Sequence, residues 1–176
     1  ETDEQSSTPH LEFKLSVHVL QIHRAALQVI DPVSSSEPHG FNVSTSYQIM
    51  IQLENPGNGQ DTYEFVARVL PNEFVSSEDV TFTYFNPTRT LGPLGTTFMP
   101  LGIELNENLP AASPFYLEFE WASIINKSVS ATTPLLIQAE QRHEWEILIV
   151  GGDFQEVQPN TDYELKFNIT NIGNYQ

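Results

Sequence analysis

Cysteine is absent from this sequence. Its absence excludes a disulfide framework, a thiolate metal site and a cysteine nucleophile. It does not fix the compartment, because many exported prokaryotic proteins also contain none. Long apolar runs are missing too, and no stretch approaches the roughly 20 residues of a membrane helix. The polar start "ETDEQSSTPH" does not resemble a signal peptide and is typical of a mature terminus or of a cut through a longer chain.

Basic residues are scarce. The chain has 7 Lys and Arg against 23 Asp and Glu, which gives a formal net charge of -16. Nucleic acids and anionic lipid surfaces carry charge of the same sign and would repel it. We therefore expect no nucleic-acid partner and no membrane insertion in this segment, while cationic partners and divalent ions stay open.

Familiar catalytic motifs are also missing. There is no GxSxG, no phosphate-binding glycine loop and no HExxH, since "HEWEI" from His143 lacks the second histidine. The five histidines do not stand at metal-ligand spacings, although two of them could meet across a strand pair, His18 and His23. The others are His10, His39 and His143. We expect surface histidines, no cofactor, no metal and no enzymatic activity.

Two acidic pairs could form an acid pair or a calcium site: Glu78 with Asp79, and Glu104 with Glu107. Calcium loops place several carboxylate and amide oxygens in a tight run. The nearest such run here is "NEN" at 106–108. A solvated loop is the favoured interpretation.

Apolar residues alternate with polar ones in many short runs. In "PFYLEFEWASI" Phe115, Leu117, Phe119 and Trp121 share one face while the glutamates point away, a pattern that a helix cannot produce. Clusters of Pro, Gly, Asn and Ser separate the runs at the spacing of a β-sandwich. The sequence therefore predicts an all-β, immunoglobulin-like β-sandwich. Its strands are expected at 11–20, 23–30, 45–54, 62–70, 80–85, 96–105, 114–125, 129–139, 145–150 and 162–170.

The same alternation predicts the core. Tryptophans and phenylalanines could instead form a sugar-binding platform, but their alternating strand positions, Trp121 and Trp145 included, favour the core. The expected core residues are Ile49, Ile51, Leu53, Phe65, Phe82, Leu101, Ile103, Phe115, Leu117, Phe119 and Trp121.

One signal occurs twice. "YQIMIQLENPGNGQ" (47–60) aligns without a gap on "YELKFNITNIGNYQ" (163–176), and "HRAALQVI" before the first resembles "HEWEILIV" before the second. The offset of 116 positions (171 against 55) is the length of one immunoglobulin-sized sandwich. We therefore expect a full repeat at 22–142 and the opening strands of an incomplete repeat at 143–176. Residues 1–21 would be an N-terminal extension or the closing strand of a preceding repeat, because "STPHLEF" resembles "TTPLLIQ" (132–138).

The run from Tyr47 to Phe65, a strand followed by "NxGNxxDTY" and another strand, resembles immunoglobulin-like modules of prokaryotic surface proteins, in particular the NEW3 and CARDB-like domains. The matching turn residues are Asn55, Gly57, Asn58, Asp61 and Tyr63, together with Thr62. The resemblance implies tandem repeats on a cell surface, often archaeal. It covers one turn and its flanking strands, and the second copy stops before its own "DTY".

The turn residues also have a direct physical interpretation. Gly57 and Gly59 can take positive φ, and the asparagine side chains can close the turn onto backbone amides. Tyr63 would start the next strand. We expect these residues to build a hairpin rather than a catalytic site.

Three Asn-x-Ser/Thr sequons occur, at Asn42, Asn126 and Asn168. Each lies where a glycan could sit: a loop, the end of the Trp121 strand and the outward face of the last strand. We expect all three side chains to be exposed, and take them together as support for an extracellular, cell-surface glycoprotein.

The function that this pattern favours is a non-catalytic structural or adhesive module of a cell-surface or filament protein, such as an S-layer, built from tandem repeats. Its expected partners are copies of itself or adjacent repeats, through β-strand pairing, with glycans as a further class. In particular, Leu11–Leu20 and Tyr163–Thr170 would pair with strands outside this sequence or fold back onto the sandwich. The alternative function is a carbohydrate-binding accessory module of a secreted glycosidase, which would expose two or three aromatics on one face.

Overall fold

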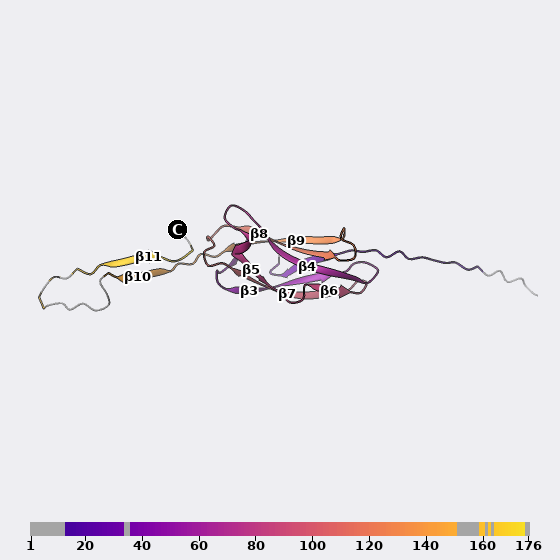
Figure 1. Ribbon diagram of the computed structural model, residues 1–176, viewed down its shortest axis with the longest axis horizontal. Coiled ribbons are helices and arrows are strands. Elements are labelled where there is room, and N and C mark those ends of the chain that lie inside the picture. The colour runs from indigo at the N-terminus through magenta and orange to yellow at the C-terminus, as the bar shows by residue number, and fades with distance from the viewer. Residues whose placement is uncertain (1–12, 34–35, 151–158, 161, 163, 175–176) are drawn as a thin grey trace, which may run out of the picture.

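The computed structural model describes residues 13–33, 36–150, 159–160, 162 and 164–174. The described residues form β-strands and one short 3₁₀ turn, η1 (Ser77–Asp79). Figure 1 shows a long molecule: a central sandwich, a two-stranded hairpin beyond one end, and an extended segment leaving the other.

The first sheet of the sandwich has four antiparallel strands in the order β1-β3-β7-β5. These are β1 (Ala26–Asp31), β3 (Ser46–Glu54), β7 (Thr96–Leu105) and β5 (Val80–Thr83). β3 lies centrally, with Ile49 opposite Leu101 and Ile51 opposite Met99 in the ladder with β7.

The second sheet has five strands in the order β2-β9-β8-β4-β6. These are β2 (His39–Phe41), β9 (Ser130–Ala139), β8 (Phe115–Ser123), β4 (Asp61–Leu70) and β6 (Thr88–Leu91). All neighbours are antiparallel except β2, which runs parallel to β9.

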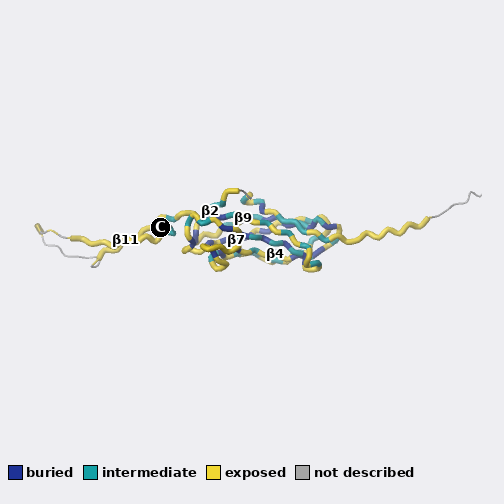
Figure 2. The backbone as a smooth tube through the Cα atoms, turned by 90° about the horizontal axis from the view of Figure 1, so that it is seen from above, coloured by how far each residue is buried: buried dark blue, intermediate teal, exposed yellow. Residues whose placement is uncertain are grey.

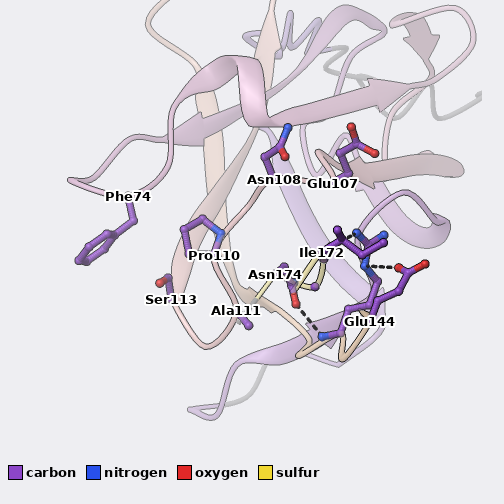
Figure 3. Close-up of a pocket in the computed structure, with 11 residues that line it drawn as sticks. Phe74, Glu107, Asn108, Pro110, Ala111, Ser113, Glu144, Ile172 and Asn174 are labelled. Atoms are coloured by element: carbon purple, nitrogen blue, oxygen red, sulfur yellow. Dashed lines mark hydrogen bonds and ion pairs between the residues drawn. The ribbon is translucent and has the colours of Figure 1, made fainter. Parts of the chain in front are cut away.

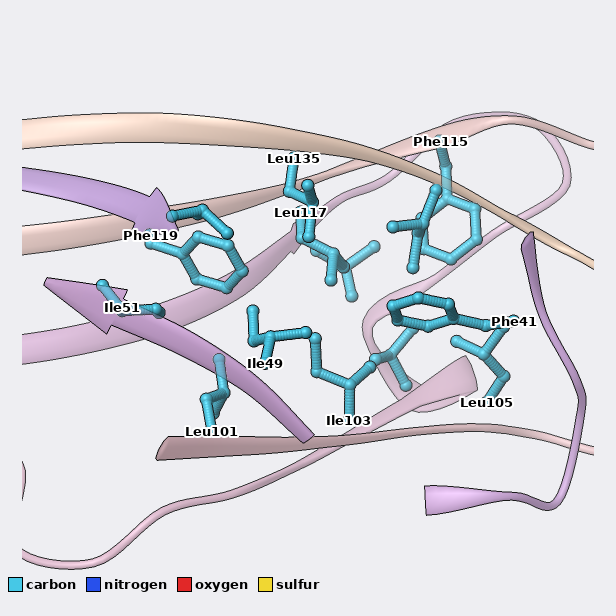
Figure 4. Close-up of a cluster of buried hydrophobic side chains, with 14 of the residues drawn as sticks. Phe41, Ile49, Ile51, Leu101, Ile103, Leu105, Phe115, Leu117, Phe119 and Leu135 are labelled. Atoms are coloured by element: carbon cyan, nitrogen blue, oxygen red, sulfur yellow. The ribbon is translucent and has the colours of Figure 1, made fainter. Parts of the chain in front are cut away.

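Alternate residues of both sheets meet in one core, seen in Figure 4. On β8, Phe115, Leu117, Phe119 and Trp121 are buried while the glutamates between them stay half-buried, as the alternation predicts. Within the sandwich, the expected core is correct for every residue except Phe82, which is only partly buried against it. Burial of large apolar side chains contributes roughly 1.5–3 kcal/mol each relative to exposure, so this core holds the sandwich together.

The described part of the strand predicted at 11–20 forms no strand within this chain. Residues 13–25 are extended but join no ladder in this chain. Phe13, Leu15, Val17 and Val19 are all exposed. The period-two pattern is that of a strand, but a strand requires a partner, and sequence alone cannot supply one.

The sequence does not predict two of the strands, β2 and β6. Both lie within runs that are rich in turn-forming residues. Both are short edge strands, of three and four residues. They are fixed by the neighbours that they pair with, β9 and β4, rather than by a pattern of their own.

The remaining strands, β10 (Trp145–Ile149) and β11 (Phe167–Asn171), pair only with each other. They form a separate antiparallel sheet beyond the end of the sandwich, and all their residues are exposed, as Figure 2 shows. Trp145, expected in the core, is therefore 62% exposed. Of the strand expected at 163–170, residues 167–170 pair with β10 within this chain, whereas residues 13–20 join no ladder in it. The two ends therefore differ, although the sequence predicts the same kind of pairing for both.

The turn between β3 and β4 is an arch rather than the expected hairpin. β3 pairs with β1 and β7 in one sheet, and β4 pairs with β6 and β8 in the other. The chain therefore crosses the sandwich at Asn55–Gln60. Turn residues predict a reversal of direction, but they do not distinguish a hairpin from a crossover.

Candidate functional site

The side chain of Asn55 organises the arch. It is fully buried. Its Oδ1 accepts from the Gly57 amide at 2.9 Å, and its Nδ2 donates to the Gly59 carbonyl at 2.8 Å. The same Nδ2 reaches the carbonyls of Leu91 and Gly92 at 3.1 and 2.9 Å. One amide group thus fixes the arch and ties it to the loop before β7, as the sequence predicts for asparagines closing the turn.

Gly57 allows another backbone segment to pass close to the arch. The sequence suggests instead that this glycine provides a positive φ, and the structure corrects that expectation. Neither Gly57 nor Gly59 has a φ in the left-handed region. A Cβ on Gly57 would instead collide with the backbone carbonyl of Ile22 and lie 2.9 Å from Asn55 Oδ1. The missing side chain lets the segment that enters the sandwich lie directly against the arch.

Asn58 holds that segment. The Ile22 amide donates to Asn58 Oδ1 at 2.6 Å, and Asn58 Nδ2 donates to the Leu20 carbonyl at 2.9 Å. Next to it, Gln21 Nε2 donates to the Gln60 carbonyl at 2.9 Å. Leu20–Arg24 is called the entry linker below, because it leads into β1 while gripped by the arch.

Asp61 binds the next residue of the entry linker. Its carboxylate is buried, and Oδ2 lies 2.7 Å from Nδ1 of His23. The Thr62 amide donates to Oδ1 at 2.7 Å, and Ser123 Oγ donates to both oxygens at 3.0 and 2.9 Å. The buried carboxylate is thus fully satisfied. His23 was expected at the surface and proves to be half-buried, a role that its sequence position did not indicate.

A serine, a histidine and an aspartate meet here in an order that does not suit nucleophilic catalysis. In a catalytic triad the serine hydroxyl bonds to the histidine, which the aspartate orients from its far side. Here Asp61 lies in the middle and Ser123 bonds to the carboxylate. Ser123 is itself buried and also accepts from the Asn126 amide at 2.9 Å. The cluster can hold a segment but presents no activated hydroxyl.

Tyr63 also binds the entry linker and connects it to the core of the sandwich. Its hydroxyl donates to the Arg24 carbonyl at 2.7 Å, and its ring stacks on Trp121. Burial, and secondarily the charge of Asp61, raises the pKa of Tyr63 to about 12. The phenol therefore stays protonated and able to donate at any ordinary pH. Four motif residues therefore contact the entry linker: Gly57, Asn58, Asp61 and Tyr63.

The second copy of the motif repeats several of these contacts at the base of the hairpin. The Arg142 amide donates to Asn174 Oδ1 at 2.6 Å, and Asn174 Nδ2 donates to the Glu140 carbonyl at 2.9 Å. The Gly173 amide donates to Asn171 Oδ1 at 3.0 Å. A Cβ on Gly173 would collide with the Arg142 carbonyl, as one on Gly57 would with Ile22.

The strand registers agree as well. β1 pairs with β3 through Ala26–Glu54, Leu27–Leu53, Gln28–Gln52 and Val29–Ile51. Advancing the first strand by 120 positions and the second by 116 gives Glu146–Thr170, Ile147–Ile169, Leu148–Asn168 and Ile149–Phe167, which are the observed partners of β10 and β11. The hairpin therefore repeats the geometry of the first two long strands of the sandwich.

A hollow of about 850 Å³ lies where the hairpin meets the sandwich (Figure 3). The loop after β7 forms one wall, including Glu107 and Ser113, and the hairpin base forms the other. Asn174 crosses between them, because its carbonyl accepts from the Ala111 amide at 3.0 Å. Arg142 Nε is buried without a hydrogen bond but lies 3.3 Å from Glu144 Oε2 as an ion pair.

The four acidic residues considered as a calcium site, Glu78, Asp79, Glu104 and Glu107, line one smaller hollow of about 280 Å³. Asp79 is engaged in capping η1, where its Oδ2 accepts from the Ser76 amide and hydroxyl at 2.8 Å. Within the described ranges, no three His, Asp or Glu side chains are grouped closely enough to hold a metal. His18 and His23 lie on one extended segment and do not meet across a strand pair.

The sequons differ from the expectation at one position. Asn42 and Asn168 are exposed, but Asn126 is half-buried. Asn126 Oδ1 accepts from Ser128 Oγ at 2.7 Å, within its own sequon. Asn42 Nδ2 donates to the Tyr47 hydroxyl at 2.8 Å. A turn that packs back on Ser123 lowers the exposure of Asn126, which sequence position alone did not indicate.

Comparisons with known proteins bear on the fold. No protein-family model matches the chain, and neither does any curated protein.

In the part that the structure describes, no helix is long and apolar enough to cross a membrane.

Solved structures do match. A family 123 glycoside hydrolase from Clostridium perfringens is similar at TM-score 0.50 and 7% identity, over 66% of this chain and 27% of that one. A FixG-related protein from Vibrio parahaemolyticus matches at TM-score 0.49 and 12% identity, over 67% and 98%. The E. coli chaperone DraB matches at TM-score 0.44 and 12% identity, over 70% and 64%. Similarity at these identities concerns architecture alone, and the central unit is an immunoglobulin-like β-sandwich.

Proposed function

We propose that this chain is a non-catalytic structural or adhesive module, part of a cell-surface or filament protein built from tandem immunoglobulin-like repeats. The observation that carries the proposal is the repeated register and repeated asparagine contacts of β1–β3 and β10–β11. A module that begins again 116 to 120 positions later, with the same grip on its incoming chain, is suited to form an array.

The contacts of the motif residues support a structural role, because they hold a neighbouring segment of the chain in place. Asn58, Asp61 and Tyr63 bind backbone or side-chain groups of the entry linker. The buried Asp61 and the half-buried His23 therefore fix the path of the chain. Neither His23 nor Asp61 lines either of the two hollows described above.

Strand pairing is the proposed mode of partnership. Phe13, Leu15, Val17 and Val19 are more than 70% exposed in an extended segment, and the hairpin exposes Ile147 and Ile169. Unpaired edges and exposed apolar strand faces favour pairing with further strands. The resemblance of the turn motif to prokaryotic surface modules is consistent with adjacent repeats, or copies of the chain, as the partners.

An extracellular, cell-surface location is proposed from the sequons and the acidic composition, and it can be tested directly. Lys14 and Lys127 are exposed. Treating intact cells with a membrane-impermeant amine reagent should label these lysines in the native protein, as mass spectrometry would detect. Labelling that occurs only after lysis would contradict the proposed location.

A carbohydrate-binding accessory module is the second candidate, favoured by one feature of the outer face of the first sheet. Phe85 is 85% exposed and lines a hollow of about 320 Å³ with Tyr84 and Pro100. Phe98, two residues before Pro100 on β7, is also exposed. Aromatic faces of this kind can stack on sugars. Trp121, by contrast, is completely buried and unavailable.

Glycan binding separates the two candidates. The native chain, a Phe85→Ala variant and a Tyr116→Ala control on the opposite sheet would be passed over a glycan array. A structural module should bind nothing specific. Sugar binding lost in Phe85→Ala but kept in Tyr116→Ala would favour the accessory-module function.

A further inference from the structure

The two asparagine arches are alike in what they hold but differ in what covers them. Asn174 is half-buried, because the loop after β7 lies against it: Asn174 accepts from the Ala111 amide at 3.0 Å and its Nδ2 lies 3.4 Å from the Leu109 carbonyl. Asn58 is exposed, and among the described residues no hydrogen bond reaches its carbonyl. The arch that contains Asn174 is therefore packed against the end of the sandwich. The arch that contains Asn58 exposes the corresponding surface.

The segment ahead of the first arch fits the same comparison. Glu140–Arg142, held by the second arch, directly follows β9. Leu20–Ile22, held in the same way by the first arch, directly follows the extended segment 13–19. That segment therefore occupies the position in the chain that β9 occupies one repeat later.

Its apolar residues fall in the register of β9. The 120-position offset that relates the two held linkers places Leu15, Val17 and Val19 on Leu135, Ile137 and Ala139, which are the buried residues of β9. Lys14, Ser16 and His18 fall on the outward positions 134, 136 and 138. This register replaces the match of "STPHLEF" to 132–138, which implies an offset of 125 positions and begins outside the described residues.

We propose that residues 13–19 are the closing strand of a preceding β-sandwich, and that the exposed arch Asn55–Gln60 docks against the end loop of that sandwich. The partner is a sandwich of this same type whose β8-like strand pairs with its β4-like strand but has a free edge on the other side. Leu15, Val17 and Val19 enter its core, and the Asn58 carbonyl accepts from the backbone amide equivalent to that of Ala111. A second copy of the sandwich described here is a poor partner, because its β9 already pairs with β8 and its end loop already carries the hairpin.

This inference rests on the proposed tandem-repeat function, and hydrogen exchange of the native polypeptide, isolated from its source, tests it. Amides of residues 14–19 should exchange slowly, as those of β9 do, whereas in the isolated 176-residue chain they should exchange at the rate of an unpaired strand. Rapid exchange at 14–19 in the native polypeptide overturns the inference. If β10 and β11 are protected there at the same time, the repeat proposal stands and only the closing strand is lost.

A matched pair of substitutions gives a second readout. Val17→Asp places charge on the face assigned to the core, and Ser16→Asp places it on the face assigned to solvent. In the native polypeptide Val17→Asp should lower the melting temperature and release the protection of 14–19, and Ser16→Asp should do neither. In the isolated chain both variants should melt like wild type. Equal behaviour of the two variants in the native polypeptide overturns the assignment.

Discussion

The phenol ring of Tyr63 lies stacked on the indole of Trp121, with ring centres 4.9 Å apart and planes 18° from parallel. At its far end the Tyr63 hydroxyl donates to the Arg24 carbonyl. One residue of the arch motif therefore joins the core of the sandwich to the entry linker, so that a change in the phenol acts on both.

Alkaline pH should weaken the protein through this residue. The pKa of Tyr63 is raised from 10.0 to about 12, chiefly by burial. The folded state therefore holds the phenol proton more tightly than the unfolded chain. The protonated phenol therefore stabilises the folded state fully below pH 10, and this contribution is lost as pH rises towards 12. Each unit of the pKa shift corresponds to about 1.4 kcal/mol of folding free energy. Denaturant titrations across this range should show a falling free energy of unfolding.

Tyr63→Phe provides the control. Loss of the hydroxyl should cost on the order of 1 kcal/mol at neutral pH, because the Arg24 carbonyl loses its donor. The substitution should also reduce the fall in the free energy of unfolding between pH 10 and 12. Tyr116→Phe, at an exposed tyrosine, should keep the wild-type decline. An identical decline in wild type and Tyr63→Phe would contradict the role given to burial.

Gly57→Ala should displace the entry linker. Its Cβ would meet the Ile22 carbonyl, and overpacking of this kind costs roughly 1–3 kcal/mol. Gly92→Ala in the adjoining loop is the matched control, because nothing lies within 4 Å of its Cβ. Thermal denaturation should separate the two variants, and faster hydrogen exchange at 20–24 should accompany only the first. Equal stabilities would remove the close approach as the reason for this glycine.

Trp121→Ala should destabilise the sandwich by about 3–5 kcal/mol, as expected when a fully buried aromatic is truncated. Trp145→Ala, at an exposed hairpin position, should leave the main unfolding transition unchanged. Chemical denaturation followed by circular dichroism measures both. A cost below about 1 kcal/mol for Trp121→Ala would be inconsistent with its place in the core.

Glycosylation should favour the two exposed sequons. Asn42 and Asn168 are accessible, whereas Asn126 is half-buried and bonded within its turn. Glycopeptide mass spectrometry of native protein should find sugar on at least one of the first two and less on Asn126. Unmodified peptides at all three positions would remove this support for an exported protein.

The long strands could be predicted from the sequence because alternation over nine or ten residues leaves no other way to bury one face. The alternation predicts β7 at its observed bounds, 96–105, and predicts β3 and β8 to within two residues at either end. β2 and β6 could not be found, because their edge positions depend on neighbours that are distant in sequence. The sequence predicts a hairpin in place of the arch for the same reason, because long-range pairing decides which sheet β4 joins.

The turn motif was recognised from its residues, but its purpose was not. Asn55 does close the turn. Nothing in "NPGNGQ" indicates that Asn58 and Gly57 face a linker more than thirty positions earlier. The sequence does not reveal the roles of His23 and Asp61, because a side-chain contact between residues 38 positions apart leaves no local pattern. The repeat at 171–174 was the available signal, since a turn used twice to the same spacing has a reason beyond reversing the chain.

The central claim is that each arch fixes its incoming linker and thereby holds adjacent units in one orientation. The chain contains no cysteine, so a spin-label pair at Thr132→Cys and Glu146→Cys can report the distance between sandwich and hairpin by pulsed electron paramagnetic resonance. The account predicts a narrow distance distribution that Asn174→Ala broadens and that Asn168→Ala, on the exposed face of β11, leaves narrow. A distribution that is already broad in the parent chain, or that stays equally narrow in Asn174→Ala, would contradict it.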